Sequence, residues 1–504
     1  MSETPGSPGT PGSPNNNGKP VMGWFLFLVT IAAVFGLGLL FASIMERRDE
    51  ARVRPPMTQI DKFETDNSKW AENWPREYAS FREMDDDTTK TKYGGSGERD
   101  YLAETPENVI LFAGYGFSKD YLQARGHTYA VKDITETGRN NGKLPATCWS
   151  CKSPDVPRMM SEFGKKKVDN PDTATLQELA LAGAGEFYSH SWNDFKDDIT
   201  HPIGCLDCHD PDTMRLRISR PALIEAFERQ GKDVNKVSHQ EMRTLVCAQC
   251  HVEYYFKGKG KYLTFPWDGG MSPEAMEEYY NDADFKDWTH AISKTPMIKM
   301  QHPDYEVYST SVHAFRGVSC ADCHMPYRSE GGAKYSDHHL QSPLLNIANS
   351  CAVCHRWSED ETRGRVNAIQ DKNAEGRSRA ERAITLAHFD IAACMQIGAT
   401  DDQLASIRAL VRTAQMNWDY VAANNGMGFH NPQECLRILA KAVEKAQEAR
   451  VEAVRLLATY GYTKQVAYPD FSSKEKAQAL NSAFIAGEGP DLLGGFKVSK
   501  AALN

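Results

Sequence analysis

The chain has 504 residues, of which 41% are hydrophobic and 25% are charged, so it contains enough apolar material for a globular body. Its formal net charge is −9, and acidic and basic residues are mixed along it without a basic stripe. We therefore expect no nucleic-acid partner, because proteins that bind nucleic acid concentrate Lys and Arg on one surface.

Two segments of unusual composition open the chain. Residues 1–20 are rich in Pro, Gly, Ser and Asn and predict a disordered tail, since they bury too little apolar surface to offset their ordering entropy. Residues 21–45 carry no charge and are long enough to cross a bilayer of about 30 Å as a helix. The run exceeds a usual cleaved h-region and no clean Ala-x-Ala site follows it. We expect a retained transmembrane signal anchor, with a long signal sequence as the alternative.

The rest of the chain divides by composition into four parts. Residues 46–100 are polar and predict a connecting segment, and residues 101–357 are irregular and hold five cysteine pairs. Residues 358–465 predict a bundle of long amphipathic helices, a possible dimer interface, and residues 466–504 a C-terminal tail. The expected fold is mainly α, an irregular domain with little strand followed by that helical bundle.

The clearest expected helix begins after Asn431, with Pro432 in its first position and Glu434 in a capping-box position. Gly461 is placed to end it. Two further helices are expected at residues 379–397 and 401–424, from their amphipathic pattern.

Ten of the twelve cysteines form five pairs with two residues between the members, a spacing unlike that of a disulfide framework. The other two, Cys394 and Cys435, are expected to be buried apolar residues. Four pairs are followed directly by His, as c-type haem requires, because two thiols bond the porphyrin and the imidazole binds the iron. These are Cys205-Leu-Asp-Cys208-His209, Cys247-Ala-Gln-Cys250-His251, Cys320-Ala-Asp-Cys323-His324 and Cys351-Ala-Val-Cys354-His355. The motifs predict that the irregular part of the chain is a multihaem cytochrome c domain with little strand.

Other uses of Cys-x-x-Cys pairs fit this sequence less well. A zinc site needs further ligands in series and no His after every pair, and thioredoxin-like chemistry uses one pair in a βαβ context. Covalent haem attachment takes place outside the cytoplasmic membrane, so we expect the body of the protein in the periplasm.

The first pair differs, because Cys148-Trp-Ser-Cys151-Lys152 has Lys where the ligand His belongs. An amine can bind iron only after losing its proton, which coordination to a cation can achieve despite an ordinary pKa of about 10.4. The alternative is an altered haem site whose Lys152 faces solvent. The motif alone does not decide whether this haem is catalytic or whether Lys merely replaces His as a ligand.

The Lys motif followed by four His motifs resembles the pentahaem cytochrome c nitrite reductase family, which forms ammonia. The resemblance covers residues 101–462 and includes Arg125-Gly-His127, the run from His251 to Phe256, and Lys299-Met-Gln-His302-Pro303. It implies a periplasmic enzyme with five covalently bound haem c groups, a calcium ion, a homodimer, and a membrane quinol-oxidising cytochrome as electron donor. The substrate it implies is nitrite.

The resemblance also implies residue roles. Lys152 would be the proximal ligand of the catalytic haem, with Arg139, Tyr254 and His302 on its distal face and Arg125 as the alternative to Arg139. Calcium would be held by the side chains of Glu253 and Gln301 and the carbonyls of Tyr254 and Lys299, all oxygen donors as this cation prefers. The distal ligand of the haem at Cys205 and Cys208 would be His338, with His339 as the alternative. The distal ligand would be His127 for the haem at Cys247 and Cys250, His430 for the haem at Cys320 and Cys323, and His313 for the haem at Cys351 and Cys354. The remaining His190, His201, His239, His290 and His388 are expected at the surface or in packing positions.

The expected reaction is the reduction of nitrite to ammonium, which takes six electrons and eight protons. Arg139 and His302 would hold the nitrite oxygens by charge-assisted hydrogen bonds, and His302 would donate protons because its ordinary pKa of about 6.5 lies near working pH. Two alternatives remain open. One is an electron conduit without its own substrate, and the other is a reductase of hydroxylamine, nitric oxide or sulfite.

Overall fold

The computed structural model describes residues 6, 9, 19–50 and 58–497. The expected tail at residues 1–20 lies almost entirely outside the described residues. The chain divides into two compact units, Met1–Pro55 and Pro56–Asn504. In the first unit, α1 (Lys19–Glu50) includes the apolar stretch Met22–Glu46, whose mean hydropathy is 2.6 and whose length fits either a membrane span or a signal sequence.

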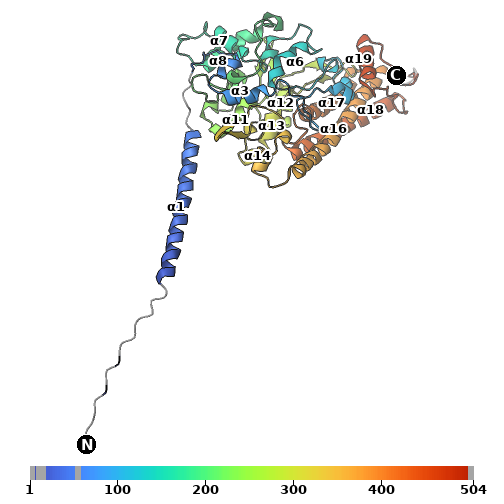
Figure 1. Cartoon of the computed structure of the whole chain (residues 1–504). Helices are drawn as coiled ribbons and strands as arrows, with labels where there is room; N and C mark the ends of the chain where they lie inside the picture. The colour runs from blue at the N-terminus through green and yellow to red at the C-terminus, as the bar shows by residue number, and fades with distance from the viewer. Residues whose placement is uncertain (1–5, 7–8, 10–18, 51–57, 498–504) are drawn as a thin grey trace. The chain divides into compact units, whose positions relative to one another are not determined.

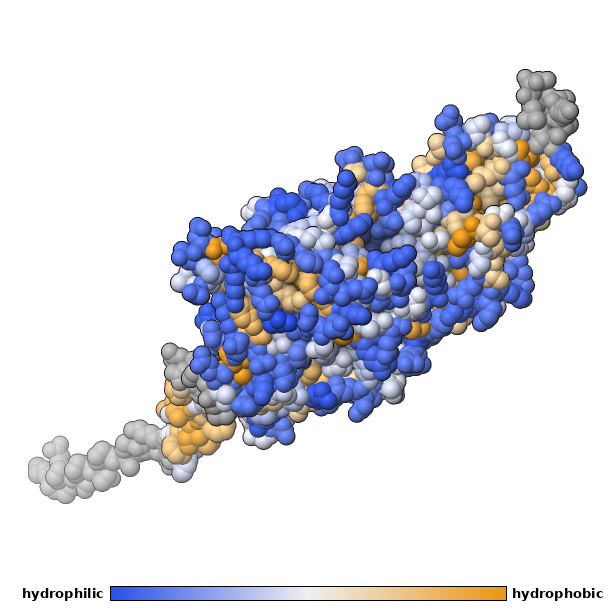
Figure 2. Space-filling view, turned by 90° about the horizontal axis from the view of Figure 1, so that it is seen from above, coloured by the Kyte–Doolittle hydropathy of each residue, from blue (hydrophilic) through white to orange (hydrophobic). Residues whose placement is uncertain are grey.

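Over residues 58–497 the second unit is built from helices, with three short antiparallel ribbons of two strands each (Figure 1). The visible face of this unit in Figure 2 is largely hydrophilic, with small apolar areas. The expected mainly α fold with little strand is confirmed. The strands pair as β1 (Tyr255–Lys257) with β2 (Tyr262–Thr264), β3 (Trp288–Thr289) with β4 (Pro296–Met297), and β5 (Tyr327–Glu330) with β6 (Ala333–Ser336).

The part that carries the cysteine pairs consists of short helices, because Pro, Gly and capping side chains interrupt the chain at close intervals. Helices α7 and α8 pack closely, since Gly164 and Gly183 stand where any Cβ would meet the backbone of the other helix. The α-helices of this part are α2 (Asn67–Trp70), α3 (Pro75–Arg82), α4 (Tyr101–Glu104), α5 (Glu107–Leu111), α6 (Ala130–Glu136), α7 (Asp155–Gly164), α8 (Leu176–Ser189), α9 (Cys205–Cys208), α10 (Pro221–Arg229), α11 (His239–Ala248), α12 (Pro273–Asp282), α13 (Asp304–Ser309), α14 (Val312–Phe315) and α15 (Cys320–His324). Single 3-10 turns lie at η1 (Gly116–Ser118), η2 (His127–Tyr129), η3 (Ala146–Trp149), η4 (Trp192–Asp194), η5 (Val234–Lys236), η6 (Pro343–Leu345) and η7 (Cys351–Val353).

Three long helices, α16 (Glu359–Gln396), α17 (Asp401–Ala422) and α18 (Pro432–Thr459), pack against one another (Figure 1). Helix α18 begins where the sequence predicted, because the Asn431 side chain accepts a hydrogen bond from the Glu434 amide at 3.3 Å. Helix α16 begins well before the expected residue 379. Its first turn is capped by Ser358, whose hydroxyl accepts from the Glu361 amide at 3.2 Å.

The segment 466–504, expected as a tail, contains the helix α19 (Lys474–Ala486), which packs against α5. Asn481 donates a hydrogen bond to the Ser118 hydroxyl at 3.1 Å, so polar contacts fasten this helix to η1. Both Cys394 and Cys435 are fully buried among the core side chains of the bundle, as expected.

Candidate active site

Four pairs of histidine rings face each other across the unit formed by the short helices. A metal–imidazole bond of about 2 Å on each side of one ion places two ring centroids roughly 6 Å apart. Each pair therefore has the spacing that a single iron requires, and each fits the axial positions of one c-type haem. His302 lies at the same spacing from His251, so spacing gives His251 two neighbours of this kind. The ring centroids are 6.2 Å apart for His209 and His338, 6.5 Å for His127 and His251, 6.3 Å for His324 and His430, and 6.4 Å for His313 and His355.

Backbone carbonyls orient several of these rings. The Nδ1 atom of His209 lies 2.9 Å from the Met214 carbonyl, and that of His338 lies 2.9 Å from the Ser336 carbonyl. An Nδ1–H that donates to a carbonyl fixes the tautomer and leaves Nε2 free for a metal. The neighbouring His339 is engaged elsewhere, because its Nε2 lies 3.1 Å from the carboxylate of Asp87.

The five cysteine motifs form a connected series in space, here numbered along the chain from the one at Cys148. The third motif borders the first, the second and the fourth, and the fifth borders the fourth. The sulfur atoms that interact across motifs are Cys151 with Cys250, Cys247 with Cys320, Cys208 with Cys250, and Cys323 with Cys351.

The turn that carries Lys152 is packed between aromatic and backbone partners. Trp149 stacks on Trp192 with ring centroids 3.4 Å apart and planes 13° apart. The Ala146 amide donates to the His190 carbonyl at 3.0 Å, which ties the start of the motif to the end of α8. The motif with the unusual ligand therefore has a defined backbone position.

Arg139 lies near this motif and near Tyr254. Its guanidinium carbon is 4.1 Å from the centroid of the Phe117 ring, and its charge acts on both Tyr254 and Cys148. A guanidinium over an aromatic face is held by the ring quadrupole. Phe117 thus supports Arg139 beside Tyr254.

The alternative residue, Arg125, has other partners. Its Nε donates to Asp133 at 2.9 Å, its Nη1 lies 3.2 Å from Glu98, and its guanidinium stacks on Tyr129. These contacts occupy Arg125, so the geometry favours Arg139 for the distal face.

The His302 side chain is exposed, and its ring centroid lies 6.4 Å from that of His251. Desolvation by the surrounding protein, followed by the charge of Lys152, lowers the pKa of His302 to about 3. The ring is therefore neutral at pH 7, whereas the sequence suggested an ordinary value near 6.5. Burial likewise raises the pKa of Tyr254 well above its usual range, so its hydroxyl keeps its proton.

The segment with Glu253 and Tyr254 contacts the segment with Lys299 and Gln301, so the four residues expected to hold calcium lie together. Glu253 is fully buried, and its carboxylate accepts hydrogen bonds from the Tyr280 hydroxyl at 2.7 Å and the Gln301 amide at 2.5 Å. The Gln301 side chain lies 3.0 Å from the carbonyl of Lys299. A buried carboxylate grouped with a carbonyl and a side-chain amide is a donor set that suits a hard cation.

The electrostatics at Glu253 point in the same direction. Burial raises the pKa of Glu253 well above its usual range, so the charged form is unfavourable there without a nearby cation. The ammonium of Lys299 does not serve Glu253 directly, because it pairs with buried Asp419 at 2.9 Å. Lys299 contacts the Gln301 side chain through its backbone carbonyl, not through its ammonium.

Two buried clusters were not singled out by the sequence. One joins Arg220 and Asp207 to the turn that carries Lys152, and the other stacks His290 on His388 with ring centroids 3.6 Å apart. The sequence offered one sign of the first cluster, because Asp207 lies inside the second cysteine motif. The second cluster confirms the expected packing role of these two histidines.

Comparison with known proteins gives a consistent result. Residues 66–488 match the profile of the cytochrome c552 family. Proteins named cytochrome c-552 from Parabacteroides distasonis and Bacteroides fragilis are each 50% identical, over 93% and 91% of both chains respectively. A solved cytochrome c nitrite reductase from Desulfovibrio desulfuricans, described with two calcium sites in its catalytic subunit, superposes with a TM-score of 0.72 at 36% identity, over 79% of this chain and 88% of that one. The expected resemblance to the cytochrome c nitrite reductases is confirmed, and the chain belongs to the cytochrome c552 family.

Proposed function

We propose that this protein is an ammonia-forming nitrite reductase with five covalently attached haem c groups, one of which has Lys152 as its proximal ligand. The observation that carries the proposal is an asymmetry among the motifs. In each of the four His motifs, a second histidine ring lies about 6 Å from the motif's own ring, centroid to centroid. Among the described residues, the side chains near the Lys motif are instead Arg139, Tyr254 and His302. An anion-binding set in place of a sixth ligand favours catalysis over electron transfer alone.

A haem held by Cys148, Cys151 and Lys152 would supply electrons and bind a small anion. Arg139 neutralises the charge of nitrite and donates hydrogen bonds to its oxygens. Because both partners are charged, these hydrogen bonds are stronger than those between neutral groups. His302, neutral before the anion enters, donates an N–H and takes up a further proton when negative charge develops beside it. The hydroxyl of Tyr254 is a second protonated donor.

Calcium is proposed at the oxygen atoms of Glu253, Tyr254, Lys299 and Gln301. The ion would balance the Glu253 carboxylate, which burial otherwise disfavours, and would hold the chain on both sides of the distal residues. It also adds positive potential for an anionic substrate.

The arrangement of motifs supports a route for electrons. The third motif borders the first, so the haem attached at Cys247 and Cys250 is the proposed immediate donor to the Lys152 haem. The four haems with two histidine ligands would then form the chain of carriers that feeds it.

Three further proposals concern the location of the protein, its electron donor and its oligomeric state. The body is placed in the periplasm, with residues 21–45 as a membrane anchor and a membrane quinol-oxidising cytochrome as electron donor. A homodimer is proposed through the helical bundle, because α18 exposes Val451 and Val454 at 49% and 57% of their surface.

The deciding experiment measures ammonium formed from nitrite by the purified holoprotein with a reduced viologen as donor. We expect one ammonium for six viologen electrons, with slower turnover of sulfite, and a high-spin haem signal in electron paramagnetic resonance. An electron conduit predicts six-coordinate low-spin iron throughout and no ammonium. Faster turnover of hydroxylamine or sulfite than of nitrite would instead assign another substrate.

A further inference from the structure

The fully buried side chain of Arg220 holds the backbone of the turn that carries Lys152. Its Nε donates to the Ser150 carbonyl at 2.5 Å and its Nη2 to the Ser153 carbonyl at 3.0 Å. Ser150 and Ser153 stand on either side of Cys151 and Lys152. One guanidinium therefore donates hydrogen bonds to the backbone immediately before and after the residues proposed to bind the haem.

The same guanidinium is anchored to the second cysteine motif. Its Nη2 lies 2.5 Å from Oδ1 of Asp207, the residue before Cys208, and the Asp207 carboxylate also accepts from the Gly204 amide at 2.8 Å. Asp207 is only 3% exposed, so neither charge of this pair reaches water. A buried pair of this kind is strongly disrupted when one partner is removed, because the other charge is left without compensation.

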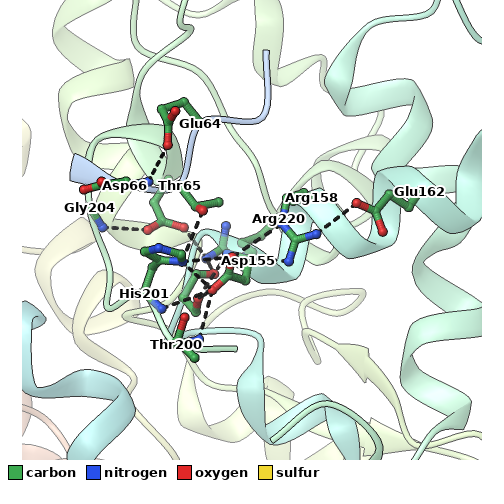
Figure 3. A network of polar contacts seen from close by, with 12 residues as sticks. Glu64, Thr65, Asp66, Asp155, Arg158, Glu162, Thr200, His201, Gly204 and Arg220 are labelled. Carbon is green, nitrogen blue, oxygen red and sulfur yellow. Dashed lines mark hydrogen bonds and ion pairs between the residues drawn. The ribbon is translucent and has the colours of Figure 1, made fainter. Parts of the chain in front are cut away.

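The third cysteine motif joins the same cluster through Gln249, the residue before Cys250. Gln249 accepts from the Arg220 amide at 3.2 Å and donates to the Asp207 carbonyl at 3.0 Å. Figure 3 shows Arg220 within the network that also includes Asp155 and His201. The attachment turns of three haems are thus fixed to one another by one buried polar cluster.

A lysine ligand needs such support more than a histidine ligand does. An imidazole has a second nitrogen, and in His209 that atom bonds to a carbonyl and fixes the ring. The amine of Lys152 ends a flexible chain of four methylenes and has no second atom through which the protein can orient it. Its position is therefore set by the backbone to which it is attached.

We propose that Arg220 is a positioning residue that holds the turn around Lys152 so that the amine stays on the catalytic iron. This inference rests on the proposed function, because it takes Lys152 as an iron ligand. Arg220 touches neither the substrate nor the reacting atoms, and Asp207 and Gln249 keep it in place.

The chain offers a matched control. Arg243 on α11 pairs with Asp322, the residue before Cys323, and so links the third and fourth motifs as Arg220 links the first and second. Among the described residues, Arg243 contacts Gln240, Asp322 and Tyr327 and makes no hydrogen bond or ion pair with the Lys152 turn. A change there disturbs a comparable ion pair between haem attachment segments without touching the lysine ligand.

The test compares Arg220→Lys and Arg243→Lys in the full-length holoprotein. For Arg220→Lys we expect five haems per chain and unchanged low-spin signals, but an altered high-spin signal in electron paramagnetic resonance and a kcat lower by roughly 10- to 100-fold, as for other residues that orient metal ligands. For Arg243→Lys we expect the wild-type high-spin signal. A wild-type high-spin signal and kcat in Arg220→Lys would overturn the inference.

A second variant covers the case in which Arg220→Lys loses haem. Asp207→Asn keeps the shape of the anchor but leaves the Arg220 charge without its partner, and we expect a change of the same high-spin signal. An unchanged signal in Asp207→Asn would then overturn the inference. Failure of the proposed function is a separate result, since it would show as a wild-type protein without any high-spin haem.

Discussion

Asp304 holds His251 by a hydrogen bond of 3.1 Å between its carboxylate and the Nδ1 atom of the ring. The other oriented rings, such as those of His209 and His338, face backbone carbonyls instead. Although burial opposes it, the hydrogen bond from His251 lowers the pKa of Asp304 to about 2, so the acid stays ionised. A carboxylate partner makes an imidazole a stronger electron donor than a carbonyl does, and this stabilises the oxidised metal.

We therefore expect Asp304→Asn to raise the reduction potential of the haem attached at Cys247 and Cys250. The shift should be on the order of 60 mV, the value of a tenfold change for a one-electron couple. A redox titration followed by visible spectroscopy measures it. Asn425→Ala removes a donor to Asp304 but leaves the carboxylate on His251, so it should not raise the potential. An equal rise in both variants would contradict this account.

Arg139→Gln should raise the KM for nitrite by roughly tenfold to a hundredfold, which corresponds to the loss of a hydrogen bond to a charged group. Steady-state kinetics with a viologen donor measures the change. Arg125→Gln serves as the control, because Arg125 is engaged with Asp133 and should leave the KM unchanged. The reverse pattern would assign the distal arginine to position 125.

His302→Ala should retain all five haems and lose roughly 10²- to 10⁴-fold in nitrite turnover, the usual contribution of a positioned proton donor. Haem content by absorbance and ammonium production are the two measurements. Turnover near the wild-type value would show that the distal assignment is wrong.

Calcium removal by a chelator should lower both activity and thermal stability, and added calcium should restore them. Binding at a hundredfold excess over the Kd stabilises the folded state by about 2.7 kcal/mol. Glu253→Gln should abolish this response. Glu306→Gln is the control, since burial raises the pKa of Glu306 to about 8 and the residue is already uncharged at pH 7. A calcium response that survives in Glu253→Gln would place the ion elsewhere.

The stacked pair of His290 and His388 should make the fold sensitive to acid. Burial lowers the pKa of His388 to about 4, and burial followed by His388 lowers that of His290 well below its usual range. Below the ordinary value of about 6.5 the unfolded chain takes up protons that the folded chain refuses, so stability falls by up to about 1.4 kcal/mol per pH unit for each group. The fall extends from pH 6.5 down to about 4 for His388.

Melting temperatures at pH 7.5 and 5.5 test this effect. The decrease between the two should be smaller in His388→Gln than in the wild type, whereas replacing exposed His239 by Gln should leave it unchanged. Equal decreases in all three proteins would assign the acid sensitivity to other groups.

The sequence predicted the parts of this protein whose signals are local. The capping pattern at Asn431 placed the start of α18 correctly, and the cysteine spacing identified the attachment turns. The start of α16 was missed because its first half is polar, and buried Gln370 and Asn373 there make contacts that no apolar periodicity reveals.

Choices between adjacent candidates depended on distant residues. His338 and His339 are indistinguishable in sequence, and only Asp87, far away along the chain, shows which of them is already engaged. Arg220 was missed for a related reason, since it bonds to backbone carbonyls, which leave no mark on residue identity. Ligand roles for Lys152 and the facing histidines remain predictions that rest on spacing and resemblance.

The facing histidine rings also determine how the chain is tied together. The segment between His209 and His338 contains the third and fourth motifs, and that between His324 and His430 contains the fifth motif and two long helices. With iron ligated as proposed, each haem closes a long loop, and these loops overlap, so the haems act as cross-links that restrict the unfolded chain. With these ligands, the haem attached at Cys205 and Cys208 would lack its distal ligand until the later part of the chain, which carries His338, had folded back onto it.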